Sequence, residues 1–128
     1  MNIYYRITQV GDTDSQPTIY ELEIPFQNYY INIYTATSHL PHKRLAKYRP
    51  LSYFMIFSGD VLGIEVYPKG GGVMEPDHKV EIEKPNKETL KLLIEKVGGG
   101  ISSGVGLRRD IKPEDIVNEF LKTLLIEQ

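Results

Sequence analysis

The fold is decided by residues 20–34, which read YELEIPFQNYYINIY. Before Pro25, the residues Tyr20, Leu22 and Ile24 alternate with glutamates. The same alternation returns after the proline, with tyrosine or isoleucine at every second position. A period of two along the chain predicts a β-strand with one buried face. The stretch therefore predicts two consecutive strands, the first of which ends at Pro25.

More strands are predicted on both sides of this stretch. Residues 3–8 alternate in the same way, and the polar turn cluster at 11–17 would join them as a hairpin to the first of those two strands. The continuous apolar run at 51–57 predicts a central strand that is covered on both sides. Residues 61–67 predict a further strand. Residues 79–83 predict a strand at a sheet edge, because charged residues flank its apolar positions.

The last third of the chain changes from the period of a strand to the period of a helix. Apolar residues follow the N-capping residue Asn86 at helical spacing as far as Gly98, and a second helix is predicted to begin at Pro113. Strands followed by helices predict an α+β fold, in which an antiparallel or mixed sheet of about five to six strands carries both helices on one face. A chain of 128 residues suits a single domain that spans residues 1–128.

The composition limits the function. The chain has 15 Lys and Arg against 17 Asp and Glu, a net charge of −2, so any nucleic-acid binding must depend on a local basic patch. The absence of cysteine excludes disulfides, thiolate metal sites and cysteine nucleophiles. No run resembles a signal peptide or a membrane span, and we expect a soluble, cytoplasmic protein with no cofactor and no membrane partner. Abundant Ile, Tyr, Lys and Glu, with no Cys or Trp, are compatible with a thermophile.

The segment between the two predicted helices is the most unusual part of the sequence. It holds five glycines in nine positions, followed by two arginines. Glycine lets backbone N–H groups approach a ligand closely, while serine hydroxyls and forked arginine cations match phosphate oxygens. A phosphate or nucleic-acid backbone site is therefore predicted at Gly98, Gly99, Gly100, Ser102, Ser103, Gly104, Gly106, Arg108 and Arg109. Alternatively, Gly98 caps the first helix and the remainder is a connecting surface loop.

A helix that ends around Leu92-Leu93 leads into Val97-Gly98-Gly99-Gly100-Ile101-Ser102-Ser103-Gly104-Val105-Gly106. This arrangement resembles the C-terminal glycine-rich loop of the repeat-associated RNA-binding (RAMP) proteins of CRISPR systems. In that family the loop lies on a ferredoxin-like domain and contacts the RNA backbone. The resemblance covers this short segment of the chain, and it implies that RNA is the ligand of the loop.

A second candidate site is the basic segment 42–49. It carries one histidine and four lysine or arginine residues around a tyrosine. Basic residues neutralise phosphates, and an aromatic ring can stack on an unpaired base. The predicted contacts are Lys43, Arg44, Lys47, Tyr48 and Arg49. Alternatively, the segment is a solvated loop or short helix whose Leu45 and Tyr48 pack on the sheet. If it lies beside the glycine-rich segment, the two would form one groove.

The other titratable residues form no recognisable catalytic pattern. His39 and His42 have a spacing that suits a metal ion on a helix, but Pro41 interrupts the helix and no third ligand follows, so no metal site is predicted. His42 could act as a general base in metal-independent RNA cleavage, and it is the candidate if the chain is an enzyme. We expect the glutamates that share a strand face to be solvated: Glu21 with Glu23, and Glu81 with Glu83.

These observations favour a binding protein over an enzyme. The first hypothesis is a module that binds RNA, another single strand or a nucleotide phosphate. The alternative is a structural or interaction protein that acts as a homo-oligomer or an assembly subunit, as is typical of small proteins from archaeal viruses and mobile elements. It rests on tyrosines beyond those that one small sheet buries, because interfaces are enriched in tyrosine: Tyr4, Tyr30, Tyr34 and Tyr53. A metal-independent nuclease is the third option.

Overall fold

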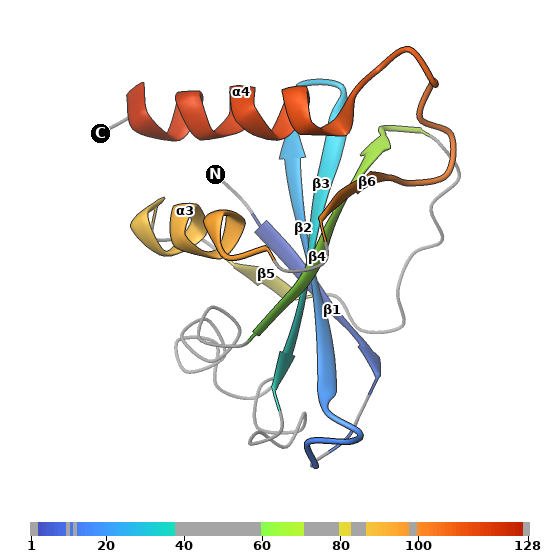
Figure 1. Cartoon of the computed structure of the whole chain (residues 1–128), viewed down its shortest axis with the longest axis vertical. Coiled ribbons are helices and arrows are strands. Elements are labelled where there is room, and N and C mark those ends of the chain that lie inside the picture. The colour runs from blue at the N-terminus through green and yellow to red at the C-terminus, as the bar shows by residue number, and fades with distance from the viewer. Residues whose placement is uncertain are drawn as a thin grey trace.

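The computed structural model describes residues 3–9, 11, 13–37, 60–70, 80–82, 87–97 and 100–126. Within these ranges the chain forms a six-stranded sheet and two helices (Figure 1). The strands are β1 (Ile3–Gln9), β2 (Thr18–Phe26), β3 (Tyr29–Thr37), β4 (Asp60–Pro68), β5 (Val80–Ile82) and β6 (Ile101–Ser103). The helices are α3 (Lys87–Glu95) and α4 (Pro113–Ile126).

The sheet is mixed, and its strands follow the order β5-β1-β2-β3-β4-β6. All neighbours are antiparallel except β4 and β6, which are parallel. The predicted α+β fold is therefore confirmed. The predicted hairpin is the β1–β2 pair, and the predicted edge strand at 79–83 is β5 at one end of this order. The strand predicted at 51–57 lies outside the described residues.

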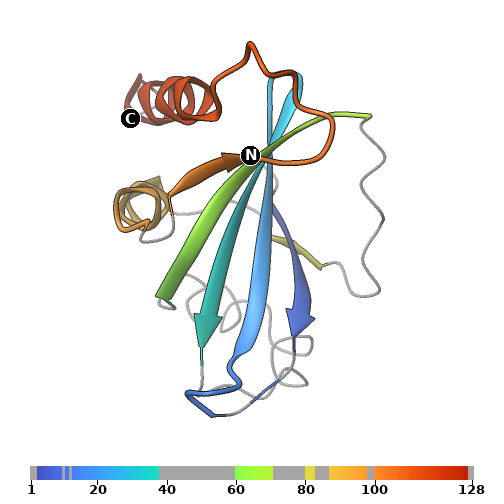
Figure 2. The same cartoon turned by 45° about the vertical axis from the view of Figure 1, so that its right-hand side comes forward.

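Both helices cover the same face of the sheet, as Figure 2 shows. Helix α4 begins at Pro113, whose fixed φ suits a first helical position, and acidic side chains complement the positive end of the helix in its first turn. Its Phe120 is fully buried and meets the ring of Phe26 edge-on, with centroids 5.2 Å apart. Neither described helix is long and apolar enough to cross a membrane.

The hydrophobic core lies between these helices and the sheet. It takes alternate residues from the four longest strands and one stripe from each helix, as the two periodicities predict. Burying a side chain as large as leucine or isoleucine contributes about 1.5–3 kcal/mol, so the apolar faces determine how the layers meet. The fully buried members with the largest side chains are Ile3, Tyr20, Leu22, Ile24, Ile31, Ile33, Ile64, Leu90, Phe120 and Leu124.

Strand β2 continues past Pro25 to Phe26, so the prediction that Pro25 ends the strand is wrong by one residue. Proline lacks a backbone N–H and is tolerated where one side of a strand is open. The pairing of β1 with β2 extends no further than Glu23, whereas β3 continues to pair as far as Phe26. Gln27 then turns the chain into β3 with a positive φ of 54°.

Candidate functional site

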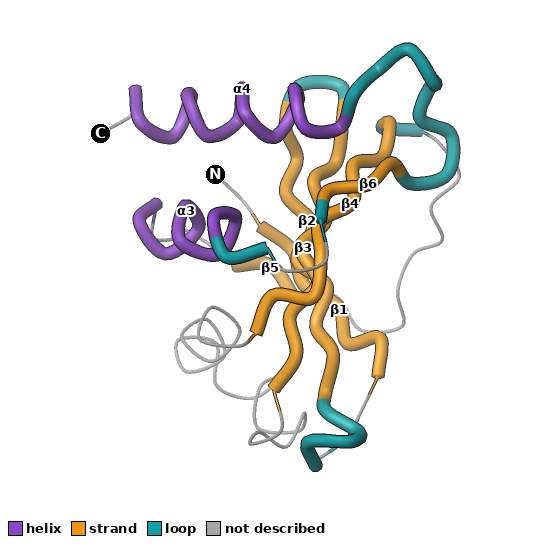
Figure 3. The backbone as a smooth tube through the Cα atoms, viewed as in Figure 1, coloured by secondary structure: helices purple, strands orange, loops and turns teal. Residues whose placement is uncertain are grey.

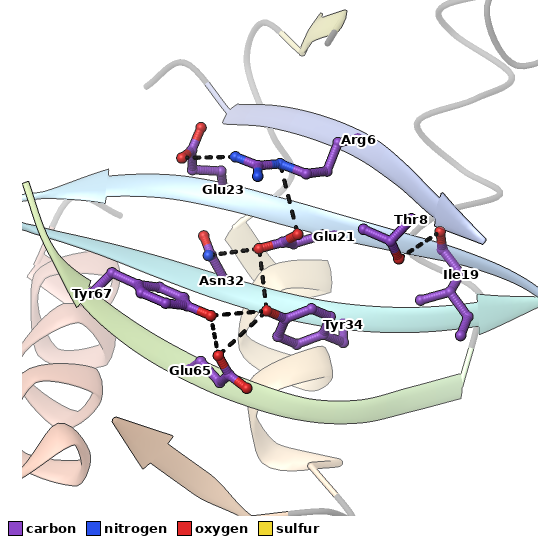
Figure 4. Close-up of polar contacts among 9 residues, drawn as sticks. All are labelled: Arg6, Thr8, Ile19, Glu21, Glu23, Asn32, Tyr34, Glu65 and Tyr67. Carbon is purple, nitrogen blue, oxygen red and sulfur yellow. Dashed lines mark hydrogen bonds and ion pairs between the residues drawn. The ribbon is translucent and has the colours of Figure 1, made fainter. Parts of the chain in front are cut away.

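The second face of the sheet, which carries no described helix, is polar (Figure 4). Its side chains alternate with the core residues of β1 to β4, and neighbouring strands bring them together in register. We call this set the polar network; it consists of Arg6, Glu21, Glu23, Asn32, Tyr34, Glu65 and Tyr67.

The centre of the network is an ion-pair cluster between β1 and β2. Arg6 Nε lies 3.6 Å from Glu21 Oε2, and Arg6 Nη2 donates to Glu23 Oε1 at 3.2 Å. Only 6% of Glu21 and 5% of Glu23 is exposed. The prediction that this pair is solvated is therefore wrong. The cause is strand order, because β2 lies inside the sheet and side chains of β1 and β3 flank both carboxylates.

Two tyrosines link this cluster to Glu65 on β4. Asn32 Nδ2 donates to Glu21 Oε1 at 2.7 Å, and the Tyr34 hydroxyl donates to the same oxygen at 3.2 Å. The Tyr34 hydroxyl also lies 3.4 Å from Glu65 Oε2 and 3.1 Å from the Tyr67 hydroxyl, and Tyr67 donates to Glu65 Oε2. The network thus holds one oxygen of Glu65 in place.

The protonation of the network follows from its burial. Burial raises the pKa of the Glu21 carboxyl, although the Arg6 charge and the Tyr34 hydrogen bond act in the opposite direction. Burial, followed by the hydrogen bond to Tyr67, raises the pKa of Tyr34, so this hydroxyl keeps its proton at neutral pH. Four contacts among Glu21, Tyr34, Glu65 and Tyr67 share only two hydroxyl protons. Each of these two protons therefore serves one of the contacts at a time.

An open pocket of about 380 Å³ lies beside this network. Its lining includes the apolar residues Ile19 and Leu62 and the aromatic residue Tyr34, together with the polar residues Glu65 and Ser102. The full lining is Thr8, Ile19, Tyr34, Leu62, Gly63, Ile64, Glu65, Gly100 and Ser102. The pocket is therefore built from both the polar face and the glycine-rich segment.

The glycine-rich segment is more ordered than the predicted loop between two helices. Residues Ile101–Ser103 form strand β6, which pairs in parallel with β4 so that Ser102 lies beside Glu65. The N–H of Gly104 donates to the Val66 carbonyl at 2.8 Å and extends this contact. Figure 3 shows the strand and the loop that follows it to α4. The expected continuous loop is thus corrected to a short edge strand plus a loop.

Three glycines of the segment have a structural role. Gly100 and Gly106 have φ values of 83° and 90°, in a backbone region that residues other than glycine rarely adopt. Gly104 lies against the ring of Tyr67, which a Cβ atom would overlap. Gly100 therefore shapes the chain as it enters β6, and Gly104 and Gly106 shape the chain between β6 and α4.

The two arginines differ in their surroundings. Arg108 forms a bidentate pair with Asp110, with Nε to Oδ1 at 3.0 Å and Nη2 to Oδ2 at 2.7 Å. Both side chains are mostly exposed, and an exposed ion pair of this kind contributes at most about 1 kcal/mol. Arg109 is exposed. Among the described residues Arg109 has no ion-pair partner, so it is the cation of the two that a ligand can engage without breaking an ion pair.

The structure describes only some of the other residues that the sequence predicts as site or interface residues. Gly98 and Gly99 lie outside the described residues, as do the catalytic candidate His42 and the whole basic segment 42–49. Tyr34, one of the tyrosines predicted at an interface, is a half-buried member of the polar network. Tyr30 lies under the ammonium group of Lys69, 5.6 Å from its ring centroid.

Sequence reasoning missed Glu65, Tyr67, Asn32 and Arg6 as site residues. Their signal is a polar side chain at the same register on neighbouring strands, which becomes visible only when the strand order is known. In the part of the chain that the structure describes, no group of three or more His, Asp or Glu residues is arranged to hold a metal ion.

Comparison of the chain with protein-family models, with curated proteins and with solved structures finds no match.

Proposed function

We propose that this chain binds single-stranded nucleic acid, with one unpaired base in the pocket and the backbone along the loop that follows β6. The observation that carries the proposal is the composition of the pocket wall. Gly100 and Ser102, from the segment that the sequence singles out for phosphate, face the same pocket as Tyr34 and Glu65. Groups that suit a nucleic-acid backbone therefore lie next to groups that suit a base.

The size and surface of the pocket support this proposal. A volume of about 380 Å³ is in the range of small-molecule pockets, which begins near 300 Å³. The ring of Tyr34 and the side chains of Ile19 and Leu62 offer apolar contact to the flat faces of a base. Contact with aromatic rings is the usual way in which proteins hold unpaired bases.

The charges support a backbone path outside the pocket. Glu65 repels a phosphate, so the backbone would follow exposed groups beyond the pocket. Ser103 at the end of β6 and Arg109 in the following loop are exposed and do not line the pocket. Hydroxyl and guanidinium groups are common phosphate contacts. The resemblance of this loop to the glycine-rich loop of the CRISPR-associated RNA-binding proteins agrees with the same path.

The proposal is tested by titrating labelled single-stranded RNA and DNA of mixed sequence at two salt concentrations. We expect tighter binding at lower salt, because phosphate contacts release counterions. Arg109→Ala should weaken binding for all sequences and reduce the salt slope by about 1, the effect of one lost phosphate contact.

The matched control is Lys122→Ala, which removes the same charge from an exposed position on α4. We expect this variant to bind like the parent protein. The proposal is wrong if neither RNA nor DNA binds in low salt, or if the two substitutions weaken binding equally.

A further inference from the structure

Of the two carboxylate oxygens of Glu65 in the pocket, one is occupied by hydrogen bonds and the other is open. Both tyrosine hydroxyls lie against Glu65 Oε2. Glu65 Oε1 makes no hydrogen bond to any residue that the structure describes, and Figure 4 shows it pointing away from Tyr34 and Tyr67. A carboxylate held by one oxygen is fixed in orientation, and the open side accepts hydrogen bonds from a ligand.

A donor lies next to this acceptor. In the parallel pair of β4 and β6, Ser102 is the register partner of Glu65, and both residues line the pocket. The Ser102 hydroxyl is exposed, and it can donate to an acceptor on the ligand. The pocket thus presents a carboxylate beside a hydroxyl.

We infer that this pair selects guanine among the unpaired bases, an inference that rests on the proposed binding of single strands. The Watson–Crick edge of guanine carries two adjacent donors, N1–H and the N2 amino group, beside the O6 acceptor. The open oxygen of Glu65, Oε1, accepts from both adjacent donors, and the Ser102 hydroxyl donates to O6. An acceptor with a donor beside it in the pocket thus meets two donors with an acceptor beside them on the base.

The other bases fit this arrangement less well. Uracil has a single N–H between two carbonyl oxygens, so one carbonyl would lie against the carboxylate. Adenine and cytosine each present one amino group next to a ring nitrogen that accepts hydrogen bonds. Their ring nitrogen would face a negatively charged oxygen that has no proton to donate. Unpaired bases are commonly distinguished through hydrogen bonds to this edge.

The glycine-rich segment also fixes the orientation of Glu65. The ring of Tyr67 packs against the backbone at Gly104, and its hydroxyl donates to Glu65. Tyr34 reaches the same oxygen from β3. Through their hydroxyls, Tyr34 and Tyr67 therefore position Glu65, while Glu65 and Ser102 form the hydrogen bonds to the edge of the base.

The test uses the full chain and uridine-rich RNA oligonucleotides that differ only at one central position. We expect guanine at this position to raise the affinity about tenfold over uracil, as is typical when a pair of hydrogen bonds to a base edge is gained. Inosine, which lacks only the N2 amino group, should fall between the two. Glu65→Gln should bring all central bases to within about twofold while leaving the salt slope unchanged, since only the base contact is lost.

A control variant and a second test variant accompany this experiment. Glu119→Gln makes the same chemical change on the exposed side of α4, and it should keep the guanine preference. If Glu65→Gln fails to fold, Ser102→Ala, at an exposed position, serves in its place. It should lower the affinity for the RNA with central guanine severalfold relative to the RNA with central uracil.

The outcomes separate the two proposals. Absence of binding to every oligonucleotide overturns the proposed function. Binding with equal affinity for all central bases, or a guanine preference that survives Glu65→Gln and Ser102→Ala, overturns the guanine inference and leaves the proposed function standing.

Discussion

Gly104 lies where the chain leaves β6 and passes the ring of Tyr67. Its N–H bonds to the Val66 carbonyl, so the backbone at this position cannot move away without losing that contact. A side chain here must displace either the tyrosine ring or the strand. One residue therefore links the glycine-rich segment to the polar network, although the sequence presents it only as one glycine among several.

Gly104→Ala should destabilise the protein by about 1–3 kcal/mol, the usual effect of forcing an extra methyl group into a packed position. Urea unfolding followed by circular dichroism measures this loss. Gly63→Ala is the matched control, because its Cβ would meet only the Gly100 carbonyl oxygen at 3.8 Å, an ordinary contact. Equal stability of the two variants would contradict the packing of Gly104 on Tyr67.

At the scale of elements, the strands with two or more alternating apolar positions could be predicted from the sequence. Each such strand carries its own signal, because the period of two is local. Strand β6 has no such signal. It has only three residues next to glycines, and its pairing with β4 is long-range. The position of Glu65 beside Ser102 therefore could not be predicted.

The burial of Glu21 likewise could not be predicted from the sequence. The alternation of glutamate with leucine is equally typical of a strand at the sheet edge and of a strand inside it. Strand order makes the difference, since β2 has neighbours on both sides. The polar network at the candidate site depends on that order.

The polar face of the sheet should make stability depend on pH. The folded protein binds a proton on Glu21 more tightly than the unfolded chain does, because burial raises the pKa of this carboxyl. The stabilisation that this proton gives to the folded state is fully present below the pKa of the unfolded chain, near 4.5. It is lost as the pH rises through the pKa of Glu21 in the folded protein. One proton changes the free energy of unfolding by at most about 1.4 kcal/mol per pH unit.

Urea unfolding between about pH 4 and pH 7 measures this dependence. Glu21→Gln should have a flatter profile than the parent protein, since the amide keeps the shape of the neutral acid and does not titrate. Parallel profiles for the two proteins would show that Glu21 does not titrate in this window.

At the scale of the whole molecule, the order of strands first and helices last was sufficient to predict the α+β class. The apolar stripe of α4 and the alternating strands also identify which faces form the core. The candidate site was predictable only in part. Glycine and serine composition pointed to the segment around Ser102, but its polar partners come from β3 and β4, far away in sequence.

The proposed function places a single strand over the pocket and along the loop after β6. A nitrogen-15 NMR titration of the full chain with a short guanine-containing single-stranded RNA tests this location directly. We predict that the shifted amide signals cluster at Gly63, Glu65, Ser102 and Arg109, while the outer face of α4 stays unchanged. Shifts confined to α3 and α4, or no shifts at low salt, would contradict the claim.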